Sequence, residues 1–412
     1  MEANRVILHS DMNCFYASVE MMLNPELRGK CVAVCGSTES RHGIVLAKSE
    51  LAKKAGIQTG MVNWEAKQRC PNLILVPPQY DQYLKYSQKA HGIYYRYTDQ
   101  VEPYGMDECW LDVTGSTVFG SGMDIAEQIR KAVKEELGLT VSIGVSYNKI
   151  FAKLGSDMKK PDAITELGED MQTKIWPLPA SNLLFVGRAT TRRQEQYGIK
   201  TIGQVAQMSC EGMQNMFGVN GIKLWRYANG LDRSPVMHKD FISPMKSIGH
   251  GITCTADLED EEEVSKVLQE LSQDVGHRLR VHKLSATGVQ IGIRTSDLSS
   301  VQHQCKLPIK TQLPNEISNA GMNLFRERYQ WRKPVRALTI RAIDLVPESA
   351  PEQYSMFIDH EKRGKRIRLE DTIEDIRRRF GKKALTYASL LGDIKIPDDG
   401  RQEIMMPGVM RT

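Results

Sequence analysis

The chain has 412 residues, of which 41% are hydrophobic and 25% charged, and its formal net charge is +5 at pH 7. These values are ordinary for a soluble globular protein, and the length exceeds a single core, so two to four domains are expected. No apolar run is long enough to span a membrane and no signal peptide is evident, which predicts a cytoplasmic protein. The eight cysteines form no Cys-x-x-Cys pair, which argues against a zinc site and for free thiols.

Strands and helices alternate through the first 168 residues, which predicts an α/β or α+β sheet domain. The predicted strands are 5–11, 31–36, 73–76 and 140–146, and the predicted helices are 12–20, 48–55, 81–97, 124–137 and a segment from 148 that ends in a basic turn.

Residues 104–112 of this part carry two adjacent carboxylates, Asp107 and Glu108, among hydrophobic residues. Buried carboxylates are costly unless they are paired, hydrogen-bonded or bound to a cation. Adjacent strand residues point to opposite faces, so both can reach one site only if the backbone bends there. Taken alone, the segment fits an acidic turn between two strands equally well.

A second acidic strand end, Asp11, favours a metal site. If the two strands pair, Asp11, Asp107 and Glu108 converge, with the main-chain carbonyl of Met12 beside them. Hard oxygen ligands of this kind suit Mg²⁺. Two such ions can clamp the attacking and leaving oxygens of a phosphoryl transfer.

From about residue 169 the pattern is helical and punctuated by glycines, with turns at 186–188 and 217–221. Such turns can present main-chain N–H groups to a DNA phosphate, although packing alone also explains them. A linker follows, and then a separate domain with basic residues that suit a nucleic-acid backbone or a solvated surface. Its predicted helices are 261–281 and about 315–329, and its predicted strands lie near 288–294 and 337–345.

The tail begins with a short peptide, 353–357, whose large apolar side chains would be costly to expose without a partner pocket. Residues 361–380 then predict a highly charged amphipathic helix.

Several blocks, in this order, resemble motifs of the Y-family DNA polymerases, and specifically of the bacterial DinB or DNA polymerase IV type. They are residues 11–16, 106–112, 142–161 and 246–249. The resemblance implies an α+β fold shaped like a right hand. It divides the chain into a palm (1–12 and 80–168), fingers (13–79), a helical thumb with helix-hairpin-helix turns (169–236), a linker (237–245), a little finger (246–347) and a tail (348–412).

The resemblance also implies template-directed, low-fidelity addition of dNTPs to a primer 3′-OH by two-metal phosphoryl transfer, in translesion DNA synthesis. Asp11, Asp107 and Glu108 would be catalytic and would hold two Mg²⁺ ions together with the Met12 carbonyl. Tyr16 would be the steric gate against ribonucleotides, although a core aromatic residue is the plain alternative. The remaining substrate-binding groups would be the main-chain N–H groups of Cys14 and Phe15 and the side chains of Lys53 and Lys160.

The expected partners are a primed DNA template, dNTPs and a sliding clamp, and the chain is expected to be a monomer. Gln353, Met356 and Phe357 resemble the peptide with which bacterial polymerases bind the clamp. Two other classes of function fit parts of the chain. One is a non-catalytic, clamp-tethered DNA-binding scaffold, and the other is a nucleotidyl cyclase with a similar palm.

The chain departs from the family pattern at the substrate site and in the thumb. Asn13 stands where a second aspartate is usual, although that residue is not an expected metal ligand. Ala47, Glu50 and Lys53 stand where Thr, Tyr and Arg usually contact the triphosphate, and we expect Glu50 to face solvent because its charge would repel phosphate. Residues 184–187 replace the usual Pro-Gly-x-Gly of the first thumb hairpin.

Overall fold

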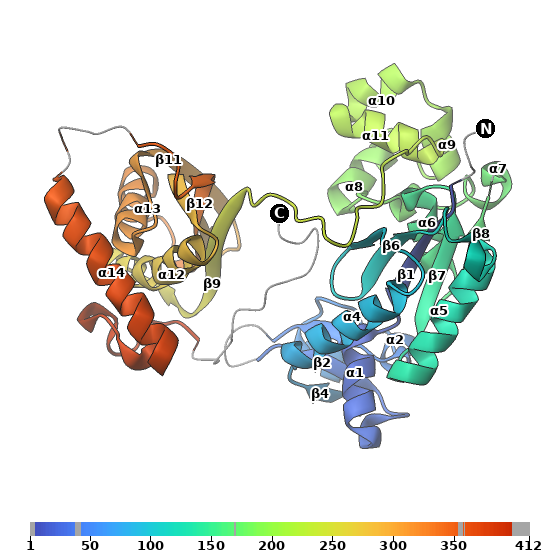
Figure 1. Ribbon diagram of the computed structural model, residues 1–412, viewed down its shortest axis with the longest axis horizontal. Coiled ribbons are helices and arrows are strands. Elements are labelled where there is room, and N and C mark those ends of the chain that lie inside the picture. The colour runs from blue at the N-terminus through green and yellow to red at the C-terminus, as the bar shows by residue number, and fades with distance from the viewer. Residues whose placement is uncertain (1–4, 38–42, 169, 353–356, 358, 398–412) are drawn as a thin grey trace. The chain divides into compact units, whose positions relative to one another are not determined.

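The computed structural model describes residues 5–37, 43–168, 170–352, 357 and 359–397. The chain divides into two compact units, and the boundary between them falls between Ser243 and Pro244. In Figure 1 the first unit runs from blue to yellow-green and the second from yellow to red. All eight cysteines are free thiols, as predicted. Within the described residues, no helix is long and apolar enough to cross a membrane.

A five-stranded sheet with the order β5-β6-β1-β7-β8 forms the centre of the first unit. Strand β1 pairs antiparallel with both β6 and β7, whereas β7 and β8 are parallel. The strands are β1 (Ile7–Met12), β5 (Val101–Pro103), β6 (Glu108–Asp112), β7 (Val141–Ser146) and β8 (Ile164–Leu167).

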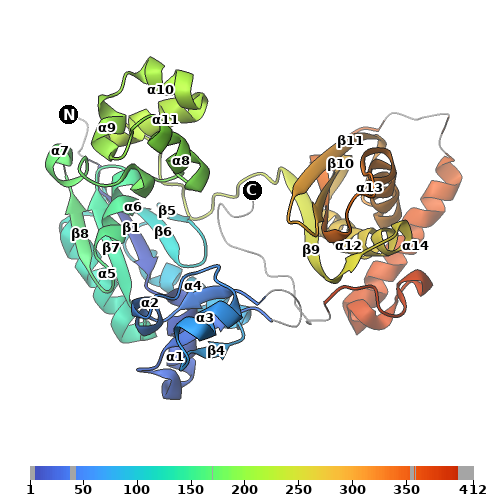
Figure 2. The same cartoon turned by 180° about the vertical axis from the view of Figure 1, so that it is seen from behind.

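Helices cover both faces of this sheet, as Figures 1 and 2 show. They are α4 (Tyr80–Tyr94), α5 (Gly122–Leu137) and α6 (Lys149–Met158). Because strand side chains alternate between faces, Leu8 packs into the core with α4 and α5, whereas Ile7 packs against Ala152 of α6. His9 and Asp11 therefore share the face of Ile7.

A smaller sheet with the order β3-β2-β4 is formed by the residues between β1 and β5. It has its own core, which includes Ala33, Val45, Ile57 and Leu73. The Ser49 side chain accepts a hydrogen bond from Ala52 N and so caps a helix of this part. Its elements are α1 (Phe15–Leu23), β2 (Val32–Cys35), β3 (Val45–Lys48), α2 (Glu50–Lys54), α3 (Asn63–Arg69) and β4 (Ile74–Val76).

Short helices complete the first unit and pack around Ile202, Val205, Met213 and Leu224. Gly218, with a φ of +64°, allows the sharp turn between the last two of them. The helices are α7 (Met171–Lys174), α8 (Arg188–Gln196), α9 (Ile202–Gln207), α10 (Cys210–Phe217) and α11 (Val219–Ala228).

The second unit is a four-stranded antiparallel sheet with the order β11-β10-β12-β9, and its core includes buried residues of α12 and α13. The elements are β9 (Ser247–Leu258), α12 (Glu261–Val281), β10 (Leu284–Thr295), β11 (Ser300–Thr311), α13 (Pro314–Arg328) and β12 (Val335–Pro347).

The predicted tail helix is α14 (His360–Phe380), and it packs on this same unit. Arg363 pairs with Glu316 of α13 at 3.0 Å, and Glu374 lies 2.6 Å from Nδ1 of His277 in α12. Arg377 also donates to the Gln273 side chain at 2.6 Å. Polar contacts therefore fasten the charged tail helix to the two helices of its own unit.

Gly144 in β7 generates a prediction about folding, because α6 crosses it too closely for any side chain. A Cβ there would lie 1.9 Å from the Ala152 carbonyl oxygen and 2.6 Å from Ser156 N. We expect Gly144→Ala to lower the free energy of unfolding by at least about 2 kcal/mol in urea denaturation.

Gly92 of α4 provides the matched control, since nothing lies within 4 Å of a Cβ built there. Gly92→Ala should stabilise the protein by about 0.5–1 kcal/mol, the usual gain for alanine in a helix interior. Equal effects of the two substitutions would contradict the close packing of α6 on β7.

Candidate active site

The pairing of β1 with its neighbours brings the predicted carboxylates together. Asp11 is the register partner of Glu108 in β6 and of Ser142 in β7. Asp107 precedes β6, and its carbonyl oxygen accepts a hydrogen bond from Met12 N at 2.9 Å. The acidic segment thus forms the turn between β5 and β6 and also places Asp107 and Glu108 next to Asp11.

The backbone bend that the two adjacent carboxylates require is present. Tyr104 N donates to the Glu108 carbonyl oxygen at 2.7 Å, which closes the turn between β5 and β6. Gly105 within that turn has a φ of +95°, a conformation that favours glycine. Only Glu108–Asp112 of the predicted segment is strand.

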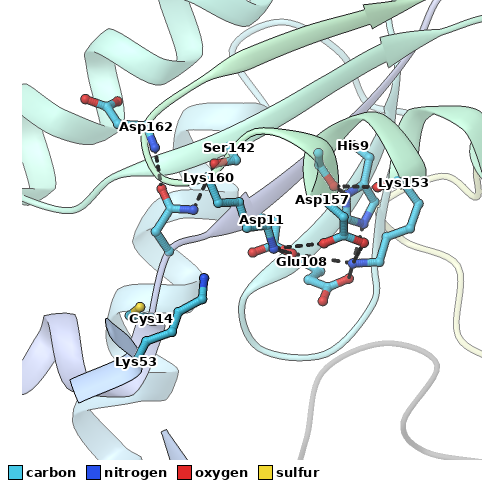
Figure 3. Close-up of polar contacts among 12 residues, drawn as sticks. His9, Asp11, Cys14, Lys53, Glu108, Ser142, Lys153, Asp157, Lys160 and Asp162 are labelled. Carbon is cyan, nitrogen blue, oxygen red and sulfur yellow. Dashed lines mark hydrogen bonds and ion pairs between the residues drawn. The ribbon is translucent and has the colours of Figure 1, made fainter. Parts of the chain in front are cut away.

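Two lysines lie directly against these carboxylates (Figure 3). Lys160 Nζ is 2.7 Å from Asp11 Oδ2, and Lys153 Nζ is 2.8 Å from Glu108 Oε2 and 3.4 Å from Asp11 Oδ2. Asp157 contacts both ammonium groups, at 3.3 Å and 2.9 Å. Lys160 was predicted to be in the site, whereas Lys153 was not singled out. The spacing of Lys153 and Asp157 by four residues, which places both side chains on one face of α6, was the available signal.

The charges of this cluster are unevenly compensated. Burial would lower the pKa of Lys160, but Asp11 and Asp157 outweigh burial and raise it. His9 and Lys153 likewise outweigh burial at Glu108 and hold its pKa below the usual value. Asp107 has no ion-pair partner among the described residues, and burial together with Asp11 and Glu108 raises its pKa to about 7.

The residues fit a divalent cation chemically, although they are not arranged around one. Among the described residues, no three His, Cys, Asp or Glu groups are close enough to enclose a metal ion, because lysine ammonium groups pair with Asp11 and Glu108 instead. Carboxylate and carbonyl oxygens are the donors that hard cations prefer. Burial, and then the charges of Asp11 and Glu108, raise the pKa of Asp107, and a bound cation would favour its ionised form.

His9 is a further member of the site that sequence reasoning did not single out. Its ring is fully buried, with Nε2 3.3 Å from Glu108 Oε2 and Nδ1 2.8 Å from Ser156 Oγ. Burial lowers the pKa of His9, which keeps the ring neutral at pH 7. The period of two along β1 places His9 on the face of Asp11 and was the signal for it.

Asn13 has a structural role that explains an amide at this position. Its Nδ2 donates to Ser142 Oγ at 2.9 Å, and its Oδ1 accepts from Asp162 N at 2.9 Å. One side chain therefore joins β7 to the turn that carries Lys160, and an amide supplies both the donor and the acceptor.

The start of α1 offers main-chain N–H groups near the carboxylates. Cys14 is its N-cap in a left-handed conformation, with a φ of +49° and no side-chain cap, whereas the Phe15 side chain lies in the core. Such uncapped N–H groups attract anions.

Glu50 does not face solvent as expected but lies against Cys14. Its Oε1 accepts a hydrogen bond from Cys14 Sγ at 3.1 Å and lies 3.8 Å from Lys53 Nζ. Burial and this carboxylate raise the pKa of Cys14 to about 12. The contact gives the Glu50 carboxylate a thiol donor and a nearby ammonium, while Lys53 itself remains half exposed.

Tyr16 is packed as a core aromatic on one side and borders the acidic site on the other. Its ring stacks on Tyr83 with a centroid distance of 4.3 Å, and its hydroxyl lies 3.5 Å from Met106 Sδ. Burial, and then the charge of Asp107, raise the pKa of Tyr16 to about 12.

The tail peptide is described only in part. Gln353 and Met356 lie outside the described residues, whereas Phe357 is described and is 96% exposed.

Comparison with known families finds matches in both units. The impB/mucB/samB family matches residues 10–157, and the C-terminal domain of that family matches 245–356. A third match, to the DNA polymerase-iota thumb domain, covers residues 182–232.

Individual relatives match over nearly the whole chain. DNA polymerase IV of Acetivibrio thermocellus is 48% identical over 94% of this chain and 98% of its own length. DNA polymerase IV 1 of Bacillus subtilis is 36% identical over 94% of each chain. Among solved structures, the Y-family DNA polymerase chimera Dbh-Dpo4(243-245)-Dbh has a TM-score of 0.74 at 22% identity, covering 83% of this chain and 99% of that one, so it shows a shared fold. The chain belongs to the Y-family DNA polymerases and is a DNA-directed DNA polymerase.

Proposed function

We propose that this chain copies a primed DNA template with low fidelity during translesion synthesis, adding dNTPs to a primer 3′-OH at the cluster of Asp11, Asp107 and Glu108. The observation that carries the proposal is the pairing of β1 with β6, which sets Asp11 opposite Glu108 beside Asp107. Membership of the Y family supports the activity. The intact carboxylates argue against a non-catalytic scaffold.

These carboxylates and the Met12 carbonyl would hold two Mg²⁺ ions. Bound Mg²⁺ would stabilise charge on the attacking and leaving oxygens of the phosphoryl transfer. With these ions bound, Asp11 and Glu108 would no longer depend on their lysine partners. The ammonium groups of Lys153 and Lys160 would then be available to the triphosphate, and Lys53 would add positive charge from α2.

The start of α1 binds and orients the nucleotide in this proposal. The main-chain N–H groups of Cys14 and Phe15 donate hydrogen bonds to triphosphate oxygens. Tyr16 is the steric gate, because stacking on Tyr83 fixes its ring at the edge of the site, where a ribose 2′-OH would meet it.

The family's domain plan and partners complete the proposal. We assign the palm to 1–12 and 80–168, the fingers to 13–79, the thumb to 169–236 and the little finger to 246–347. The enzyme acts as a monomer and engages a sliding clamp through Gln353, Met356 and Phe357.

Asp107→Asn should abolish primer extension with Mg²⁺ and dNTPs while leaving DNA affinity intact. Loss of one metal ligand removes several kcal/mol of transition-state stabilisation, so we expect the rate to fall at least about a hundredfold. Gel-based extension and fluorescence anisotropy measure the two quantities. Glu166→Gln, an exposed carboxylate on β8 of the same sheet, is the control. Wild-type protein that binds primed DNA but never extends it would favour the scaffold.

Tyr16→Ala should admit ribonucleotides, because removing the ring opens the space beside the sugar. We expect the ratio of rNTP to dNTP incorporation to rise at least about tenfold in single-nucleotide extension. Tyr16→Phe keeps the ring and loses only the hydroxyl beside Met106, so it should retain discrimination. Equal ratios for both variants would exclude Tyr16 as the gate.

The raised pKa of Asp107 predicts a stability cost in the metal-free protein. The folded-state pKa of about 7 exceeds the ordinary value of 3.8, so the folded state binds this proton more tightly. The free energy of unfolding should therefore fall as the pH rises from about 4 to about 7. Asp107→Asn removes that cost and should be more stable than wild type at pH 8 by on the order of 2 kcal/mol, but not at pH 4.

Urea denaturation with EDTA at the two pH values measures this difference. Added Mg²⁺ should stabilise the wild type and not Asp107→Asn, because only the wild type keeps the full ligand set. A difference between the proteins that is independent of pH would refute this account of Asp107.

A further inference from the structure

A pocket of about 490 Å³ lies between α8 and α11, in the part of the first unit that matches a polymerase thumb. The two helices lie side by side in Figures 1 and 2. The volume is within the range of pockets that hold small organic ligands. None of the groups assigned above to catalysis or nucleotide binding lines this pocket.

Aromatic side chains form much of its wall. Phe185 and Tyr227 face each other with ring centroids 6.4 Å apart, and Phe217 lines the pocket with them. Phe185 is 66% exposed, so most of its ring is available to a ligand. Exposed aromatic rings of this kind are the platforms on which nucleobases stack.

Positive charge borders the aromatic wall. The guanidinium of Arg193 in α8 lies over the Phe217 ring, 5.6 Å from its centroid. Lys223 of α11 lines the pocket from the other helix. Neither group has an acidic partner among the residues that the structure describes. Asn220 and Thr190 add hydrogen-bonding groups to the wall. Aromatic platforms beside free cations are the combination that binds single-stranded nucleic acid.

Phe185 has two further features that suggest a use for its ring. Its φ is +68°, a left-handed conformation that disfavours a bulky residue and that glycine would adopt without strain. It also lines a second cavity, of about 190 Å³, whose other walls include Lys153 and Asp157 of the acidic cluster. Phe185 therefore borders both the thumb pocket and a cavity that reaches two residues of the acidic cluster.

We infer that this thumb pocket binds an unpaired base of the DNA substrate. The base stacks on Phe185, and Arg193 and Lys223 neutralise the flanking phosphates. A pocket for the sugar-phosphate backbone alone would need donors and cations but no aromatic wall. A base within a duplex is paired and stacked and cannot enter, so the ligand is a single-stranded or extrahelical nucleotide.

The inference rests on DNA as the substrate but not on catalysis, so its test measures binding without dNTPs or metal. The probes are a fluorescent dT12 and a 12-residue strand of the same backbone in which every nucleotide is abasic. Anisotropy titrations of the full chain give the dissociation constant for each probe. Primer extension on a fully paired template, measured separately, reports the proposed function, so failure of one is distinguishable from failure of the other.

Phe185→Ala should weaken binding of dT12 at least about fivefold and leave binding of the abasic strand unchanged. Phe185→Trp, which keeps a stacking surface, should retain affinity for dT12, whereas Phe185→Leu should not. Arg193→Ala should weaken binding of both probes by the same factor and lower the salt dependence. Phe380→Ala is the control, because Phe380 is similarly exposed (74%) but lies in the tail helix.

Two outcomes would overturn the inference. Equal weakening of both probes by Phe185→Ala would show that the pocket binds backbone and not base. Unchanged binding of both probes would show that the pocket takes no part in binding single strands.

Discussion

The pairing of β1 between β6 and β7 is the constraint on which the rest of the site depends. It sets Asp11 opposite Glu108, and the turn before β6 brings Asp107 next to Met12. A shift of one residue would turn Asp11 to the opposite face, into the core formed by α4 and α5. Helix α6 packs on the face of the sheet that carries Asp11, because Gly144 lets the helix approach there. The pairing of β1 with β6 and β7 thus fixes the positions of the carboxylates and the face on which their lysine partners approach.

The close approach of α6 also explains how a dense set of carboxylates is tolerated. Lys153 and Lys160 neutralise Asp11 and Glu108, and the buried His9 ring lies 3.3 Å from Glu108. Among the described residues Asp107 has no such partner. Burial and the charges of Asp11 and Glu108 raise its pKa, so the folded protein carries a cost at neutral pH. Asp107 is therefore the carboxylate whose charge an additional cation would relieve most.

The thumb departs from the family pattern in its first hairpin. Residues 184–187 keep Gly187, but Phe185 stands where the first glycine is usual and holds a backbone conformation that a glycine would adopt freely. In exchange the chain presents an exposed ring that borders both a pocket with cations at its edge and a cavity that reaches two residues of the acidic cluster. The replacement of one glycine by Phe185 adds an aromatic surface, which suits the inferred contact to a base.

The sequence by itself determined the elements with strong periodicity and the identity of the acidic residues. The predicted helix 261–281 coincides with α12, and the motif blocks around Asp11 and around Asp107 and Glu108 led to the correct family. Strands β9 and β11 were not predicted, because polar residues interrupt the apolar pattern of both and one face of β11 is largely exposed. Tertiary structure alone decided the positions of His9, Lys153 and Glu50. Their roles depend on which residues of α6, β6 and α1 lie opposite them, and no local pattern specifies a contact between segments that are distant in the chain.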